Sequence, residues 1–159
     1  MSEERAGAVY LRAWERALRL LEASAKSSVE LDVRLARAGF DGKVRAAVLK
    51  RLGELGLVDD ASFARSYAAR RATKGLGPAA IAAELEARGI DPHTARAAVA
   101  GVDVEAGALE AAAVQLRRLA RLPIAQQGAR LVAHLVRRGF EPELAEATAR
   151  RVLPPEGWD

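Results

Sequence analysis

The 159-residue chain is long enough for one ordinary domain or a few small modules, and half of its residues are hydrophobic, so it can bury a core. It has no cysteine, no apolar run near the roughly 20 residues that span a bilayer and no signal-peptide core, so we expect a cytoplasmic protein and neither a disulfide scaffold nor a membrane protein. The 25 basic and 21 acidic side chains leave a net charge of +4, which favours a polyanion or an acidic partner.

The composition predicts an all-α protein. Ala, Leu, Arg and Glu are frequent, whereas β-branched and aromatic residues are scarce. Straight-chain side chains lose little rotamer freedom in a helix, so this usage favours helices over strands.

The first part of the chain predicts helices over residues 9–25, 28–38 and 41–55. The second of these helices has a clear start signal at "SSVE", residues 27–30. Ser27 can accept a hydrogen bond from the amide of Glu30 while the Glu30 carboxylate reaches back, which is a capping box.

The middle part of the chain predicts helices over residues 60–74, 78–88 and 92–100. Asp59 or Asp60 is the expected N-cap of the first of these helices. Phe63 and Tyr67 lie four residues apart and should share its buried face. The sequence "GLGP" that follows gives two glycines for a sharp turn and a proline at the first position of the next helix.

The last part of the chain predicts helices over residues 103–121, 124–138 and 142–152, and it shows that the chain repeats itself. A shift of 50 residues without gaps aligns Leu31, Ile81 and Leu131, then Leu35, Leu85 and Leu135, then Gly39, Gly89 and Gly139, then Phe40, Ile90 and Phe140. The two leucine-type sets predict one buried helix face, and each glycine predicts a left-handed helix stop. An acidic residue follows each stop, with Pro92 and Pro142 next in two units, so a third helix starts at once.

The register of 50 residues fails in the long first helix of each unit. Phe63 falls opposite Ala13 and Ala113, and Tyr67 falls opposite Ala17 and Arg117. That helix face has therefore either diverged or shifted.

Three helices of this size bury little surface alone, so tandem units must share contacts. We therefore expect three tandem three-helix repeats, over residues 9–56, 57–101 and 102–153, in an elongated, curved array. No extended heptad or large apolar stripe indicates an obligate dimer, so we expect a monomer.

Charge segregation marks the candidate binding residues. No acidic residue occurs from Ala111 to Phe140, so the arginines of this block cannot pair locally, and their planar charged groups suit carboxylates and phosphates alike. The middle unit adds a basic helix in which Arg70 and Lys74 are four residues apart, with Tyr67 near their edge. The full predicted set, for binding a partner or DNA, is Arg65, Tyr67, Arg70, Arg71, Lys74, Arg117, Arg118, Arg121, Arg130, Arg137 and Arg138.

The sequence gives no support for an enzyme. His93 and His134 are the only histidines and have no metal-ligand spacing, and Asp59 and Asp60 are better explained as a helix cap than as an acid and base. The "GLGP" turn follows a helix and lacks the Gly-Lys-Ser/Thr ending of a phosphate loop. We expect no catalytic residue, no metal and no cofactor.

Residues 55–90, "LGLVDDASFARSYAARRATKGLGPAAIAAELEARGI", resemble the central repeat of the RecX family of bacterial recombinase regulators. The matching residues are Val58, Asp59, Asp60, Phe63, Ala64, Tyr67, Arg70, Arg71, Gly75, Gly77, Pro78, Ile81, Glu84, Leu85, Gly89 and Ile90. Residues 26–40 resemble the first repeat of the family, and the third repeat matches mainly by internal symmetry. The resemblance leaves the last residues, "LPPEGWD", without a role.

The resemblance implies a protein without catalytic activity that binds the RecA recombinase, lies in the groove of its filament on single-stranded DNA, and lowers ATP hydrolysis and strand exchange. Some members of the family also contact DNA directly. The residues leave two alternatives open, a DNA-binding transcriptional regulator of the helix-turn-helix kind and a passive helical scaffold. The predicted third helices of the last two units are rich in alanine, which suits packing better than base reading.

Overall fold

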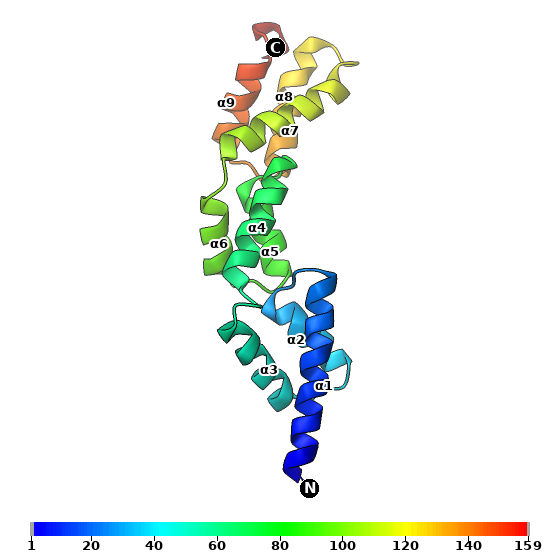
Figure 1. Ribbon diagram of the computed structural model, residues 1–159. Helices are drawn as coiled ribbons and strands as arrows, with labels where there is room; N and C mark the ends of the chain where they lie inside the picture. Colours follow the sequence, from blue (N-terminus) through cyan, green and yellow to red (C-terminus); the bar gives the residue numbers. More distant parts are fainter. Residues whose placement is uncertain (1, 159) are drawn as a thin grey trace.

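The computed structural model describes residues 2–158, which form an elongated and slightly curved column of helices with the two ends of the chain at opposite tips (Figure 1). The helices are α1 (Ser2–Ala23), α2 (Ser28–Arg37), α3 (Gly42–Glu54), α4 (Asp60–Thr73), α5 (Pro78–Ala87), α6 (Pro92–Ala100), α7 (Val104–Leu119), α8 (Gln127–Arg137) and α9 (Pro142–Val152), with short 3₁₀ helices η1 (Ile124–Gln126) and η2 (Pro155–Trp158). The described residues contain no strand. None of their helices combines the length and the hydropathy that crossing a membrane requires.

The helices form three repeats of three, α1–α3, α4–α6 and α7–α9, and the predicted all-α fold class is confirmed. Each repeat has its own hydrophobic core. The aligned sets Leu31, Ile81, Leu131 and Leu35, Leu85, Leu135 are completely buried, with one member of each set in each repeat. The exposure pattern of residues 81–90 is the same as that of residues 131–140, so the repetition extends from sequence to packing.

The predicted stop and start signals are present in the structure. Gly39, Gly89 and Gly139 have φ angles of 93°, 85° and 95°, a left-handed conformation that side chains rarely adopt. Ser27 forms the predicted capping box with Glu30. Of the two candidate caps before α4, Asp59 accepts the hydrogen bond from the amide of Ser62.

The long helices keep an equivalent packing face at a shifted register. Each buries two alanines four residues apart, Ala13 and Ala17 in α1, Ala64 and Ala68 in α4, and Ala108 and Ala112 in α7. These pairs are separated by 51 and then 44 residues, not by 50. The register failure in the sequence therefore reflects shifted helices, and the small side chains allow the other helices of each repeat to approach closely.

Two elements differ from the sequence prediction. Helix α1 begins at Ser2 and not at residue 9, because Glu3, Glu4 and the residues that follow favour a helix even though residues 2–8 are exposed and contribute nothing to the core. Helix α8 begins at Gln127 after a separate 3₁₀ turn, whereas one helix was predicted from residue 124.

The first two repeats meet through side chains. Ser28 donates from its amide and its hydroxyl to the Asp60 carboxylate, at 2.8 and 2.6 Å. The Ser27 hydroxyl donates to the carbonyl of Arg88 at 2.6 Å, and the Arg88 guanidinium donates to both oxygens of Glu30, at 3.2 and 3.0 Å. The first junction is therefore polar and charged.

The second and third repeats meet mainly through the backbone. The amide of Gly77 donates to the carbonyl of Arg138 at 2.7 Å, and the amide of Ala79 donates to the carbonyl of Gly139 at 3.3 Å. The Arg138 guanidinium donates to the carbonyls of Lys74 and Gly75, at 2.9 and 3.1 Å. The second junction thus includes bonds between main-chain groups, which a change of side chain does not remove directly.

Candidate interaction surface

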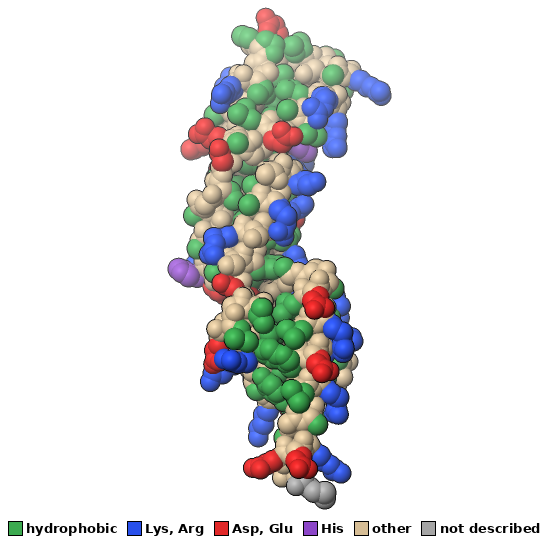
Figure 2. Space-filling view, in the orientation of Figure 1, with side chains coloured by type: hydrophobic (Ala, Val, Ile, Leu, Met, Phe, Trp, Pro, Cys, Tyr) green, Lys and Arg blue, Asp and Glu red, His purple; other side chains and the backbone are tan. Residues whose placement is uncertain are grey.

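Basic side chains gather along one edge of the molecule, over α1, α4 and α7 (Figure 2). Along these long helices, exposed cations three or four residues apart project together. We call this set, with one cation from the turn after α7, the basic edge: Arg12, Arg16, Arg19, Arg70, Lys74, Arg117, Arg118 and Arg121.

The charges of the basic edge form no salt bridge within the described part of the chain. The salt bridges there join other cations, such as Arg45 to Asp32 and Arg150 to Glu146, and none includes a residue of the basic edge. Exposed acidic side chains interrupt the edge at Glu15 and Glu22 on α1 and at Glu110 on α7, seven residues before Arg117. The edge can therefore attract carboxylates or phosphates at little desolvation cost.

Helices α7 and α8 bring part of the predicted arginine block together around His134. Burial and the neighbouring charges of Arg138, Arg137 and Arg118 lower the pKa of His134. A half-buried histidine beside three arginines stays neutral near pH 7, since its protonation would add a fourth like charge.

Two predicted binding residues of α4 are engaged by a neighbouring helix. The Tyr67 hydroxyl donates to Glu84 Oε2 at 2.7 Å, and Arg71 donates to both carboxylate oxygens of Glu84 at 2.9 Å. The hydrogen bonds from Arg71 and Tyr67 lower the pKa of Glu84 against the opposing effect of burial. Burial and the bond to Glu84 raise the pKa of Tyr67.

The aromatic surface of α4 is also covered. The guanidinium carbon of Arg88 lies 4.8 Å from the ring centroid of Phe63 and 5.2 Å from that of Tyr67. The Arg70 guanidinium lies 6.0 Å from the Tyr67 ring. Tyr67 therefore holds the arginines around it in place, and Arg70 is the exposed member of this group.

The remaining predicted residues divide between the surface and the second junction. Arg130 and Arg137 are exposed on α8, and Arg138 donates to carbonyls at the end of α4. Arg65 is exposed and donates to the Ser62 hydroxyl at 3.0 Å. It lies about half a helical turn away from Lys74, so α4 does not bring these two cations together.

Arg88 and the cations of α1 were not among the binding residues predicted from the sequence. Arg88 and Arg138 are 50 residues apart and both precede a left-handed glycine, so the internal repeat could have identified Arg88. The exposed Arg12, Arg16 and Arg19 follow helical spacing in a predicted helix, but they lie outside the acid-free block on which the prediction depended.

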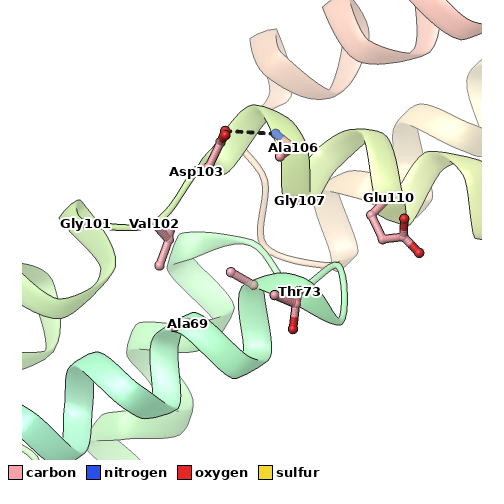
Figure 3. A pocket seen from close by; sticks show the side chains of 9 residues that line it. Ala69, Thr73, Gly101, Val102, Asp103, Ala106, Gly107 and Glu110 are labelled. Atoms are coloured by element: carbon pink, nitrogen blue, oxygen red, sulfur yellow. Dashed lines mark hydrogen bonds between the residues drawn. The ribbon is translucent and has the colours of Figure 1, made fainter.

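A groove of about 440 Å³ lies at the second junction, between α4 and α7 (Figure 3). Its walls are mostly small side chains such as Ala69, Ala72 and Ala106. The Asp103 carboxylate at its rim caps α7 by accepting a hydrogen bond from the amide of Ala106 at 3.0 Å. No group of three or more His, Cys, Asp or Glu residues that could hold a metal ion occurs within residues 2–158. The basic edge is therefore the most developed candidate surface.

Comparison with known proteins identifies relatives over most of the chain. The model for the first three-helix domain of RecX matches residues 13–52, and the model for the second three-helix domain of RecX matches residues 59–99. A regulatory protein RecX from Mycobacterium avium is 44% identical over 80% of this chain and 77% of its own length. A regulatory protein RecX from Thermobifida fusca is 39% identical over 94% of this chain and 83% of its own length.

Solved structures share the fold at low sequence identity. The crystal structure of RecX from Lactobacillus salivarius has a TM-score of 0.82 and 18% identity, and the alignment covers 92% of this chain and 97% of that one. A second crystal structure of regulatory protein RecX has a TM-score of 0.81 and 20% identity over 92% of this chain and 76% of its own. The agreement extends over all three repeats.

Proposed function

Because this chain belongs to the RecX family of regulatory proteins, we propose that it binds the recombinase RecA in its filament on single-stranded DNA and lowers ATP hydrolysis and strand exchange in recombinational repair. We also propose that it acts in the cytoplasm, as a monomer, without catalysis or a cofactor. The names of the relatives support a regulatory role.

The observation that carries the proposal is the basic edge, which extends along all three repeats and has no carboxylate partner within residues 2–158. A protein filament on single-stranded DNA presents phosphates and acidic side chains repeatedly along its length. An elongated array with one charged edge can contact several of these sites at once, and linked contacts raise the effective affinity.

The proposed mechanism is steric and electrostatic. The three repeats act as a basic, curved wedge across neighbouring recombinase subunits and oppose the extension or closure that ATP hydrolysis needs. Such a wedge inhibits only if it binds the inactive arrangement of the subunits more tightly than the active one. Arg70 and Lys74 are held at the centre of the array, where they can join the contacts made by the outer repeats.

Helix-turn-helix readout of DNA fits the structure less well. The outward residues of α9 include Glu143 and Glu146, which a DNA backbone would repel. Helix α6 is nine residues long and contains four alanines, with Arg96 as its exposed cation. Neither helix contains an Asn or Gln side chain to read adenine, and Arg150 of α9 is paired with Glu146.

The proposal can be tested by titrating the protein into single-stranded-DNA-dependent ATP hydrolysis by the cognate RecA. We expect inhibition by the parent chain and much weaker inhibition by the triple variant Arg117→Glu, Arg118→Glu, Arg121→Glu. The matched control reverses three exposed cations outside the basic edge, Lys43→Glu, Lys50→Glu and Arg96→Glu. The control has the same net charge and should inhibit nearly as well as the parent.

The possible outcomes of this experiment test the proposed function and the proposed binding surface separately. An absence of inhibition by the parent chain would disprove the proposed function. Equal inhibition by the parent and the triple variant would retain the function and reject the basic edge. Tight, sequence-dependent binding to duplex DNA without an effect on the recombinase would favour the transcriptional alternative instead.

A further inference from the structure

The two junctions between repeats use the same pair of surfaces. We call the turn around the left-handed glycine after each second helix a corner, and the first turn of each second helix with its cap a seat. At each junction, the corner of the later repeat lies on the seat of the earlier repeat. The corners are residues 38–40, 88–90 and 138–140, and the seats are residues 27–30, 77–80 and 126–130.

The two occupied seats hold their corners at very short range. A Cβ atom added to Gly89 would lie 2.5 Å from Cβ of Val29, in the first seat. A Cβ atom added to Gly77, in the second seat, would lie 2.3 Å from the carbonyl carbon of Gly139. A side chain at Gly89 in the corner, or at Gly77 in the seat, would therefore clash with the neighbouring repeat.

The third seat, at the start of α8, is occupied by the segment Pro154–Trp158. A Cβ atom added to Gly128 would lie 2.3 Å from the carbonyl oxygen of Gly157 and 2.9 Å from the ring of Trp158. This approach repeats the contact between Gly77 and the Gly139 peptide at the second seat. The guanidinium carbon of Arg150 lies 4.5 Å from the Trp158 ring, which holds the segment in place.

The first corner, by contrast, has no seat against it among the described residues. A Cβ atom added to Gly39 would have no atom within 4 Å of it. Residues 38–39 are exposed, whereas the equivalent residues of the other two corners are half-buried. The first corner also has Ala38 where the docked corners have Arg88 and Arg138.

The first corner and the third seat also lack a charge pair that the first junction uses. There, Arg88 pairs with Glu30 at 3.0 Å. The 50-residue repeat gives Ala38 the position of Arg88 and gives Arg130 the position of Glu30. A corner arginine on the third seat would therefore meet a like charge.

We propose that the segment Pro154–Trp158 is an internal cap that occupies the seat of a further repeat, and that the occupant it excludes is the Gly39 corner of a second copy of this chain. The cap, Ala38 and Arg130 each oppose the same end-to-end contact. A head-to-tail contact repeats from copy to copy, so without these features copies of the chain would join into open fibres or rings. The inference is independent of the proposed function.

The test uses two variants, one that can offer only its first corner and one that can offer only its third seat. The first protein, the corner protein, is the full chain with Ala38→Arg. The second protein, the seat protein, ends at Leu153 and carries Arg130→Glu together with Gly39→Ala, whose added methyl group has room within its own chain but would clash with a seat, as it would at the docked Gly89 and Gly139. We expect each protein alone to have the mass of one chain by sedimentation velocity, and a mixture to form a 1:1 dimer that grows no further, because each protein has one usable surface.

Matched controls isolate the proposed contact. Mixtures in which residue 38 stays alanine or residue 130 stays arginine should dimerise more weakly, by about threefold, as expected for a half-exposed ion pair. Circular dichroism checks that the seat protein keeps its helices. If it does not, the full chain with Gly39→Ala, Arg130→Glu and Trp158→Ser replaces it, since this variant keeps α9, blocks its own corner and loosens only the cap.

Two results would overturn the inference. A folded seat protein that stays monomeric in the mixture at every concentration would show that the third seat does not accept a corner. Association of the seat protein with itself, or equal dimerisation with and without the Ala38→Arg substitution, would show that removing the segment exposes only a non-specific apolar surface.

Discussion

At the scale of single residues, Glu84 organises the centre of the candidate surface. Its two oxygens accept three hydrogen bonds from Tyr67 and Arg71, at 2.7 to 2.9 Å. These donors lie on α4 and Glu84 lies on α5, so the carboxylate fixes one helix against the other. The basic residues at the end of α4 then project from a rigid base, which reduces the side-chain entropy that binding would cost.

Replacing Glu84 by Gln should lower stability at neutral pH and have less effect in acid. The pKa of Glu84 is below its usual 4.5 in the folded chain, so its contribution is present above that pH and is lost as the pH falls through the folded-state pKa. We expect a loss of about 1 kcal/mol in the free energy of unfolding at pH 7, because the pair is partly exposed.

Urea unfolding at pH 7 and pH 3 checks this expectation. Tyr67→Phe removes one donor and keeps the charge pair, so it should reduce stability at pH 7, and by a smaller amount at pH 3, because the bond from Tyr67 helps to lower the pKa of Glu84. A Glu84→Gln variant that loses as much stability at pH 3 as at pH 7 would contradict the assigned role.

The candidate residues themselves were partly predictable. The acid-free block predicted Arg117, Arg118 and Arg121 as binding residues, and within the described residues none of the three forms a salt bridge. The same reasoning could not separate Arg70 from Arg71. One is exposed and the other is paired, because Glu84 comes from a helix that begins after a turn.

At the scale of elements, the three corners have the same backbone conformation and different surroundings. Gly39, Gly89 and Gly139 share positive φ angles. Only the last two lie against another repeat, at Val29 and Ala80. The cost of a side chain at a corner should therefore depend on whether that corner is docked.

Alanine at the corners should be tolerated better at Gly39 than at Gly139. Gly39→Ala introduces only left-handed strain, which costs about 1–2 kcal/mol. Gly139→Ala adds a clash with Ala80, for which overpacking typically costs about 1–3 kcal/mol more. Chemical unfolding of both variants measures the difference, and equal losses would show that the docked corner relaxes without cost.

Helix boundaries were predictable where a cap or stop determines them. The capping box at Ser27 and the glycine stops gave the ends of the short helices to within one residue. The start of α1 was wrong because hydrophobic periodicity begins only near Val9, whereas the helix is extended to Ser2 by helix propensity alone. The 3₁₀ turn at Pro155–Trp158 has no periodicity, and its position depends on Gly128.

At the scale of the whole molecule, the two junctions differ in how they are held. The first depends on the Ser28–Asp60 and Arg88–Glu30 contacts between side chains. The second adds two backbone hydrogen bonds to the contacts of Arg138. The array should therefore bend more easily between its first and second repeats, which changes the line of the basic edge.

Arg88→Gln should loosen the molecule more than Arg138→Gln. The first substitution removes an ion pair and the stacking on Phe63 and Tyr67, whereas the second leaves the amides of Gly77 and Ala79 bonded. Small-angle X-ray scattering should give a larger and broader distribution of dimensions for Arg88→Gln than for Arg138→Gln. The same broadening in both variants, or in neither, would contradict the difference between the junctions.

The sequence by itself determined the helical class, the three repeats and the positions of the corners. These features follow from local causes, since composition, spacing of four residues and glycine conformation act within one helix or turn. Tertiary structure alone decided the register of the long helices, the partners of Tyr67, Arg71 and Arg138, and the docking of Pro154–Trp158 on the third seat. Those features depend on which surfaces meet across 13 to 64 residues of chain, and the same side chain can be free or paired until that packing is known.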